Sequence, residues 1–176
     1  MAEIEEHPSK ATTWVDGVFV VSPEADRSNV TVWVSAEAHT DGAVKWELLS
    51  ATKLSADRAR LTSVPFFVYD LAYGDDVILE DQSEGDPVGA GVGKASGNET
   101  FRVVFDGARA DDDRWVSVMV DLEHLGCWFD IRGPGFMALS ASAEHAAEVA
   151  TYLAEREEDE GDLRFETGRS SDRVTD

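Results

Sequence analysis

The side chains that most often bind metal ions are few in this chain and scattered along it. They are His7, His39, His124, His145 and Cys127. A tetrahedral zinc site needs four ligands at short spacings, and His124 with Cys127 supplies only two. In the pairs Glu123-His124 and Glu144-His145, adjacent side chains point to different sides of a helix. The sequence therefore predicts no metal site.

The sequence also gives little support for a nucleophilic catalytic residue or a phosphate-binding loop. Cys127 stands between Gly126 and Trp128 at the start of an expected strand, a setting typical of a small buried hydrophobe. No Gly-x-Ser-x-Gly elbow occurs. The stretch "GAGVGKASG" contains Lys94 but continues with Ala95 and then a strand, so it fails the phosphate-loop pattern. Because 36 acidic residues always offer some pair of carboxylates, no single pair is informative. We predict no catalytic residue and no cofactor.

Binding is the chemistry that the aromatic residues suggest. The segment "LTSVPFFVYDLAYGDDVILE" brings Phe66, Phe67 and Tyr73 close together in sequence. Pro65 has no N–H group to donate to a sheet, so a central strand through it is disfavoured. We predict an irregular crossing segment whose rings fill a seam between two halves of the molecule. One alternative is an exposed groove for a ligand or partner built on these three rings. Another is a pocket at the seam lined by the same rings, with a nearby Asp or Arg102 supplying polarity.

Trp128 completes the set of candidate binding residues. It is out of phase with Cys127, Phe129 and Ile131 in the same expected strand, so its side chain lies on the opposite face of the sheet. Either the N-terminal half or a partner is expected to cover that face. The candidate binding residues are Phe66, Phe67, Tyr73, Trp128 and Arg102.

The elements that position these residues fall into two groups. Between Trp14 and Lys94 the pattern is β-rich, with strands expected in "WVDGVFVV", "VTVWVSA", "AVKWELLSATKL" and "DDVILED". In the third of these, apolar residues alternate with charged neighbours. The Gly-rich "PVGAGVG" is expected to be a flexible exit from this half. Short strands at this spacing predict a small β-barrel or sandwich.

After residue 95 the pattern of apolar residues changes and indicates both strands and helices. "ETFRVVF" is an expected strand, and an apolar stripe with helical spacing follows in Trp115, Val118, Met119 and Leu122. Acidic residues 111–113 suit the start of that helix and Gly126 its end. A hairpin around "RGPG", a second helix in "SAEHAAEVATYLAERE" and a strand in "LRFET" complete a βαββαβ order. This order is the ferredoxin-like motif, with four antiparallel strands and both helices on one face.

The predicted architecture is therefore α+β, with a small N-terminal β-barrel or sandwich followed by a ferredoxin-like half. We expect a loose N-terminus at 1–13, an all-β half at 14–95, the ferredoxin-like half at 96–167 and a loose C-terminus at 168–176.

Charge restricts the partners. The chain has 36 acidic and 15 basic residues, a formal net charge of -21, spread over its whole length. Such a surface repels nucleic acids and anionic membranes. No apolar run reaches the roughly 20 residues of a membrane span, and the acidic start with a single cysteine suits the cytoplasm. Three explanations of the acidity stay open: solubility in a salt-rich cytoplasm, docking onto a basic protein partner, or mimicry of nucleic-acid charge.

Four motifs in order resemble a known bacterial family. They are V-P-F-F at 64–67, L-x-x-G-D-x-V at 71–77, S-G-x-x-T-x-R-V at 96–103 and L-G-C at 125–127. Over roughly residues 43–167 the chain resembles the family catalogued as domain of unknown function 4265. Two positions depart from its pattern: Asn98 stands where members often have histidine, and Asp76 adds a second acid to the G-D-x-V element. The resemblance implies a bacterial or archaeal cytoplasmic protein and no assigned activity, so no catalytic residue is carried over.

We therefore expect a non-catalytic binding or regulatory protein, of an inhibitor, immunity-like or adaptor kind, that acts through an acidic surface. One alternative is a small-molecule sensor or enzyme with a pocket at the seam. The other is a homodimer that assembles through edge strands.

Overall fold

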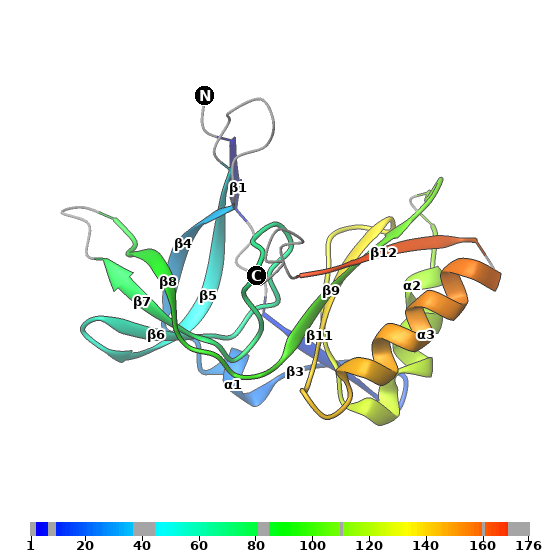
Figure 1. Ribbon diagram of the computed structural model, residues 1–176, viewed down its shortest axis with the longest axis horizontal. Coiled ribbons are helices and arrows are strands. Elements are labelled where there is room, and N and C mark those ends of the chain that lie inside the picture. Colours follow the sequence, from blue (N-terminus) through cyan, green and yellow to red (C-terminus); the bar gives the residue numbers. More distant parts are fainter. Residues whose placement is uncertain are drawn as a thin grey trace, which may run out of the picture.

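The computed structural model describes residues 3–6, 10–36, 45–80, 85–109, 111–159 and 161–168. The fold is mixed α+β and mostly sheet, with a barrel beside a second sheet that carries helices on one face (Figure 1). The strands are β1 (Glu3–Glu6), β2 (Thr12–Val15), β3 (Val18–Val21), β4 (Val30–Ala36), β5 (Lys45–Ser55), β6 (Arg58–Leu61), β7 (Asp76–Glu80), β8 (Val88–Lys94), β9 (Glu99–Phe105), β10 (Trp128–Ile131), β11 (Phe136–Ala141) and β12 (Leu163–Thr167). The helices are α1 (Pro23–Asp26), α2 (Arg114–Asp121), the 3₁₀ helix η1 (Glu123–Leu125) and α3 (Ala146–Asp159).

The first sheet closes into a five-stranded barrel. Its strands follow the order β5-β4-β8-β7-β6, and β6 pairs back onto β5. β1 adds to β5 in parallel orientation, and β8 joins β4 in parallel orientation. Side chains from β4, β5, β6 and β7 fill its interior, among them Val32, Leu49, Ala59, Leu61, Val77 and Leu79. The predicted small barrel is therefore a closed one.

The glycine-rich stretch before Lys94 is part of this barrel. We predicted a flexible exit there, and this was wrong: it forms β8, which pairs with β7 and β4. The glycines permit close packing: a Cβ on Gly89 would lie 3.1 Å from Val34, and one on Gly93 would meet the guanidinium of Arg58. Hydrogen bonds from two neighbouring strands override the low strand propensity of glycine.

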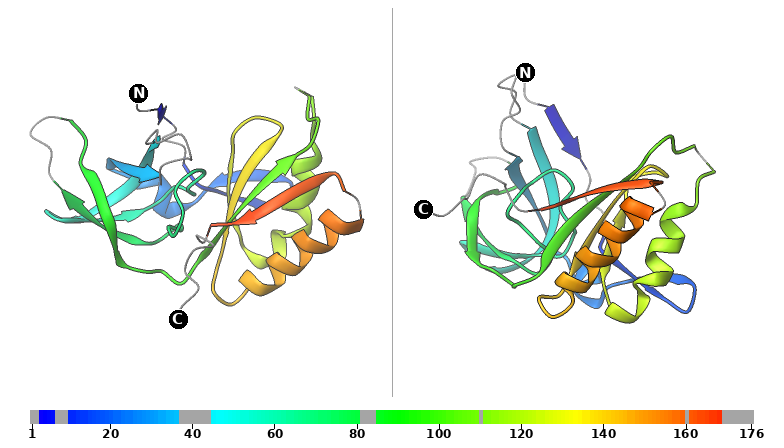
Figure 2. Two further views of the ribbon diagram at one scale, coloured as in Figure 1. Left: turned by 45° about the horizontal axis from the view of Figure 1, so that its top comes forward. Right: turned by 45° about the vertical axis from the view of Figure 1, so that its right-hand side comes forward.

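The second sheet has the order β12-β9-β11-β10-β2-β3, and each neighbouring pair is antiparallel. Both long helices, α2 and α3, cover the same face of this sheet (Figures 1 and 2). The core between sheet and helices contains Phe101, Val103, Phe105, Val118, Met119, Val149 and Leu153.

The first hairpin belongs to this second sheet and not to the barrel. We predicted residues 14–21 within the all-β half, but Thr12 of β2 pairs with Phe129 of β10. Trp14 packs against the core under the helices, and Phe19 stacks on Trp115 of α2 with ring centroids 5.7 Å apart. Local strand propensity does not identify the pairing partner, and these long-range contacts decide it.

The chain ends are held more closely than predicted. Ala11 is fully buried, and Thr12 and Thr13 lie in β2. At the other end the N–H of Gly168 donates to the carbonyl of Thr100. Residues 1–2, 7–9 and 169–176 lie outside the described part of the chain.

The helix expected after residue 113 is confirmed as α2 followed by η1, and Gly126 ends it with a φ of 63°. The predicted carboxylate cap works differently: Asp113 makes no capping hydrogen bond, whereas Asp112 accepts bonds from the N–H and guanidinium of Arg114. None of the helices within the described ranges is long and apolar enough to cross a membrane.

Candidate functional site

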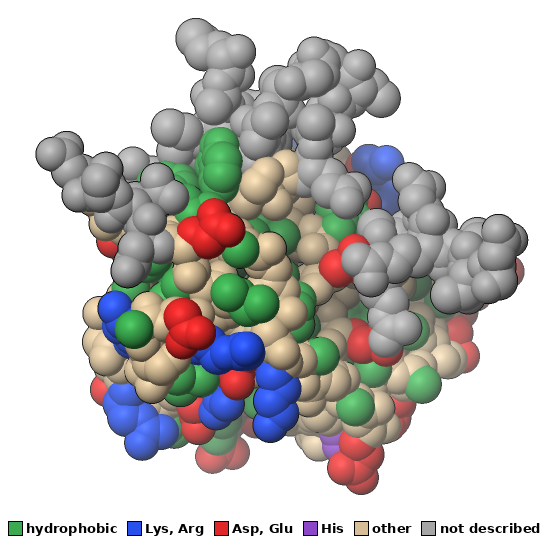
Figure 3. Space-filling view, turned by 60° about the vertical axis from the view of Figure 1, so that its left-hand side comes forward, with side chains coloured by type: hydrophobic (Ala, Val, Ile, Leu, Met, Phe, Trp, Pro, Cys, Tyr) green, Lys and Arg blue, Asp and Glu red, His purple; other side chains and the backbone are tan. Residues whose placement is uncertain are grey.

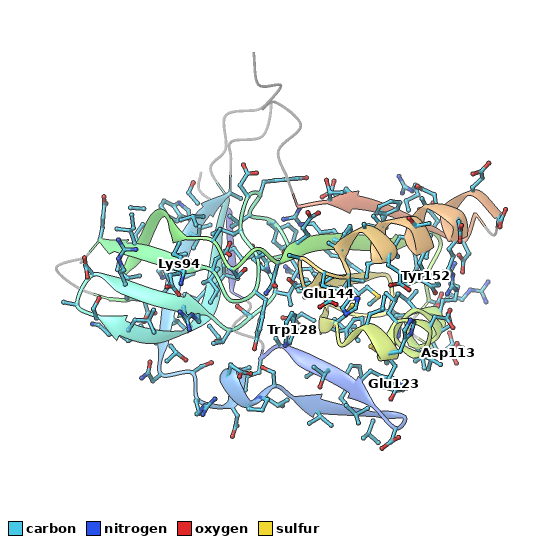
Figure 4. All side chains as sticks on the ribbon, turned by 60° about the horizontal axis from the view of Figure 1, so that its bottom comes forward. Lys94, Asp113, Glu123, Trp128, Glu144 and Tyr152 are labelled. Carbon is cyan, nitrogen blue, oxygen red and sulfur yellow. The ribbon has the colours of Figure 1, made fainter. Side chains whose placement is uncertain are left out.

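The aromatic crossing segment lies between the barrel and the second sheet. Residues 62–75 form no strand, as Pro65 predicted, and Phe66 and Tyr73 are only 1% and 4% exposed. The ring of Phe66 meets that of Phe136 edge-on, with centroids 4.9 Å apart. Tyr73 stacks on Trp128 with ring centroids 4.5 Å apart. Trp128 lies between the barrel and the helices (Figure 4). These rings are the packing between the two halves of the molecule.

A buried carboxylate holds the start of this segment. Glu47 of β5 is 0% exposed, and its two oxygens accept the backbone N–H groups of residues 66, 67 and 68 at 2.8, 2.9 and 3.1 Å. Burial raises the pKa of Glu47, and the three N–H groups and Arg102 partly offset that rise. Three N–H groups that no strand partner could satisfy are thus bonded inside the protein.

Arg102 fastens the same segment from the second sheet. Its guanidinium donates to the carbonyl of Val68, lies 3.5 Å from Glu166 and stacks 4.3 Å over the ring of Tyr69. The side chain is 2% exposed, and burial lowers the pKa of Arg102. Arg102 therefore joins the two halves, in a position closed to a ligand from solvent.

The next turn of the segment is hydrogen-bonded to the loop that precedes β9. Asp75 accepts the N–H of Ala72 at 2.9 Å and both the N–H and the hydroxyl of Ser96 at 2.7 Å. Asn98 donates its side-chain amide to the carbonyl of Tyr73 at 2.7 Å. Gly74 has a φ of 86°, and a Cβ there would lie 3.3 Å from Ser96. This close approach requires glycine at position 74.

Three of the four sequence motifs therefore meet in one structural network. The V-P-F-F residues bind Glu47, the L-x-x-G-D residues bind Ser96 and Asn98, and the S-G-x-x-T-x-R strand supplies Arg102. Asn98, in the position often occupied by histidine, serves as a hydrogen-bond donor. The additional acid Asp76 pairs with Arg60 at 2.7 Å on the barrel.

The fourth motif contributes to the core. Leu125 and Cys127 are both buried under the helices. Burial raises the pKa of the Cys127 thiol to about 12, so the thiol stays protonated at neutral pH. The described residues contain no group of three or more His, Cys, Asp and Glu side chains that could hold a metal ion.

A hollow of about 520 Å³ lies beside the Asp75 network. It is lined by Asp70, Leu71, Ala72, Asp75, Val92, Ala95, Gly97, Asn98, Glu99, Thr100 and Gly168. None of the five predicted binding residues lines it. Both carboxylate oxygens of Asp75 already accept internal hydrogen bonds.

The second open surface is the β2–β3 hairpin, which sequence reasoning did not single out. All four residues of β3 are exposed, and large apolar side chains 40–56% exposed gather here: Val15, Val18, Phe19, Val20 and Val21. The available signal was the run "VFVV", which lacks the alternation of a strand with one solvent face.

Charge is distributed unevenly over the surface. On the barrel end seen in Figure 3, Lys and Arg side chains gather on one part of the face. The sequence places Lys53, Arg58 and Lys94 on the barrel strands β5, β6 and β8.

Comparisons with known proteins agree with this fold. A solved structure described as "Novel crystal structure of a hypothetical protein from Neisseria gonorrhoeae" matches with a TM-score of 0.66 and 17% identity, over 80% of this chain and 94% of that one. No curated protein matches. The model of the family "Domain of unknown function (DUF4265)" matches residues 47–165, which include all four motifs. The chain therefore belongs to the DUF4265 family.

Proposed function

We propose that this protein is a non-catalytic binding protein of a regulatory kind, and that a protein partner docks on its β2–β3 hairpin. The observation that carries the proposal is the exposure of all four residues of β3, three valines and a phenylalanine. Contiguous exposed apolar patches are uncommon on proteins that act alone and often mark interaction sites. The family motifs, by contrast, are engaged in internal contacts.

The surrounding charge supports a basic partner. A net charge of -21 attracts a positively charged protein and speeds its encounter. An apolar patch in an acidic surface combines a desolvated centre with long-range attraction.

Affinity capture with matched variants tests this proposal. Val20→Lys places a charge on β3, and Val104→Lys places one on β9 at a valine of similar exposure, 38% against 42%. The wild type and Val104→Lys should recover the same basic protein, and Val20→Lys should lose it. Raising NaCl to about 1 M, where the screening length is about 3 Å, should release it. Equal recovery by all three forms would refute docking at the hairpin.

A small-molecule sensor or enzyme is the second candidate, and the hollow beside Asp75 favours it. Its volume lies within the range typical of ligand sites. A ligand bound there should raise the melting temperature, and Val92→Lys, which alters the lining, should abolish the shift. A broad metabolite screen without any shift would count against it.

We also propose a ferredoxin-like unit extended by the β2–β3 hairpin, in a protein of the cytoplasm. The strand order β12-β9-β11-β10 and the placement of α2 and α3 on one face support the first point. A single, buried cysteine supports the second.

A further inference from the structure

We propose that the partner binds by adding a β-strand to the outer edge of β3, and that this strand is an extended segment of alternating apolar residues flanked by lysine or arginine. This inference rests on the proposed function and specifies its binding mode. The hairpin stands at the margin of the molecule, with Glu123 beside it (Figure 4).

The edge of β3 is open for hydrogen bonding. β3 is the last strand of its sheet, and within the described ranges only β2 pairs with it. Because charge, proline or a bulge normally protects such an edge, an unprotected one can take up a further strand. β3 contains neither a charge nor a proline.

The turn fixes which backbone groups face outward. Asp16 and Gly17 have φ values of 50° and 81°, as in the two-residue turns that close tight hairpins. Val15 and Val18 are paired on either side of the turn. Along an antiparallel strand, residues whose backbone groups bond to the neighbouring strand alternate with residues whose backbone groups point away from it. The N–H of Ser22 donates to the carbonyl of Ala11 at 3.0 Å, so the backbone groups of residues 18, 20 and 22 point toward β2.

The alternation leaves the N–H and C=O groups of Phe19 and Val21 directed away from β2. An added strand would bond to these two residues. Its side chains would lie beside Phe19 on the helix side of the sheet and beside Val18 and Val20 on the other side. Strand addition of this kind draws affinity from main-chain bonds and specificity from alternate side chains.

Carboxylates stand at both ends of the open edge. At the turn, the backbone N–H of Asp16 donates to Glu123 at 2.7 Å, so the carboxylate of Glu123 lies at this end. Past the other end lie Glu24 and Asp26 of α1, which pair with Arg27 at 3.8 Å and with Lys10 at 3.1 Å on the surface. Lysine or arginine at the two ends of an added strand would face Glu123 at the turn and would share the carboxylates of α1 with these two cations.

Charge and area both favour such a segment over a second copy of this chain. Two copies would each bring a net charge of -21. A stable interface buries about 800 Å² per partner, well above what four half-exposed side chains offer. A short peptide strand needs less area because main-chain hydrogen bonds contribute.

The test uses a fluorescent synthetic peptide, Lys-Arg-Val-Thr-Val-Thr-Val-Arg-Lys, titrated with the full chain by anisotropy. We expect binding that weakens about tenfold or more when glutamates replace the flanking basic residues. Val21→Pro removes an outward N–H without breaking a bond to β2 and should also weaken binding about tenfold or more. Val21→Thr keeps that N–H and is the matched control, with a change of less than about threefold.

Two results would overturn the inference. The first is that the wild type does not bind the peptide although it still captures a partner that Val20→Lys loses. This result would refute strand addition and leave the proposed function intact. The other is a dimer in sedimentation that Val21→Pro abolishes, which would assign the edge to a second copy. If capture too is insensitive to Val20→Lys, the proposed function itself fails.

Discussion

Two apolar regions of this molecule differ in exposure: the seam between the two halves is buried, and the β2–β3 hairpin is half exposed. At the seam, Phe66 and Tyr73 are buried, and the backbone beside them is bonded to Glu47 and Arg102. At the hairpin, Phe19 and Val20 are each 42% exposed, and no strand in the described part of the chain pairs with the outer edge of β3. Both regions have apolar sequences, so composition does not distinguish them.

The difference lies in the polar groups. An irregular segment can be buried only if its N–H and C=O groups find partners, and the motif residues supply those partners. Among the described residues, β3 of the hairpin is paired on one side only, with β2. The motifs therefore explain how the fold is held together, and the site of action is expected elsewhere.

The largest contrast should come from removing one ring in each region. Phe66→Ala should lower the free energy of unfolding by about 3 to 5 kcal/mol, because it leaves a cavity in a closed interface. Phe19→Ala should cost about 1 kcal/mol, since its ring is already half in water. Urea unfolding followed by fluorescence measures both. Equal losses would mean that the hairpin ring is as deeply packed as the seam.

The carboxylate of Glu47 gives the next effect. Glu47→Gln replaces one acceptor oxygen by an NH₂ group facing backbone N–H donors, and should cost about 1 to 3 kcal/mol. The exposed Glu155→Gln is the control and should stay within about 0.5 kcal/mol. A loss no larger than that of the control would show that Glu47 does not hold the crossing segment.

The difference in unfolding free energy between the wild type and Glu47→Gln should change with pH in a defined direction. Because burial raises the pKa of Glu47, the folded protein holds its proton more tightly than the unfolded chain does. The stability contributed by this group is fully present below its ordinary pKa and falls as the pH rises through the raised value. The difference between wild type and Glu47→Gln should therefore shrink with increasing pH. A difference that grows would contradict the direction of the shift.

A single hydroxyl gives the smallest effect. The Tyr73 hydroxyl bonds to buried Ser22 at 2.8 Å, whereas the Tyr69 hydroxyl bonds to Glu166 near the surface at 2.8 Å. Tyr73→Phe should cost about 1 kcal/mol and Tyr69→Phe less than about 0.5 kcal/mol, in thermal or urea unfolding. The reverse order would place the closed part of the interface at Tyr69.

Sequence patterns predicted the parts of this fold that depend on local chemistry. Pro65 marked the irregular segment, and the phase of Trp128 placed it on the face that meets the barrel. Gly126 and the acidic residues 111–113 located the helix α2, although Asp113 makes no capping hydrogen bond. Family motifs in order identified the family. Each of these depends on residues close together in the chain.

The sequence patterns did not predict which strands pair or which residues distant in sequence come into contact. "WVDGVFVV" has the propensity of a strand in either sheet, and only its contacts with β10 and Trp115 assign it to the second. Glu47 was counted as one of the charged neighbours in an alternating strand, although it is fully buried by partners about 20 residues away. Arg102 was a candidate for the polar group of a ligand pocket at the seam, and it is buried there and joins the two halves.

Amide hydrogen exchange, residue by residue in the free protein, tests the contrast between the two regions most directly. We predict slow exchange at Phe66, Phe67 and Val68, whose N–H groups bind Glu47, and fast exchange at Phe19 and Val21. Val18 and Val20 should exchange more slowly than their neighbours on β3. Protected amides at Phe19 and Val21, or fast exchange at residues 66–68, would contradict a closed seam beside an open edge.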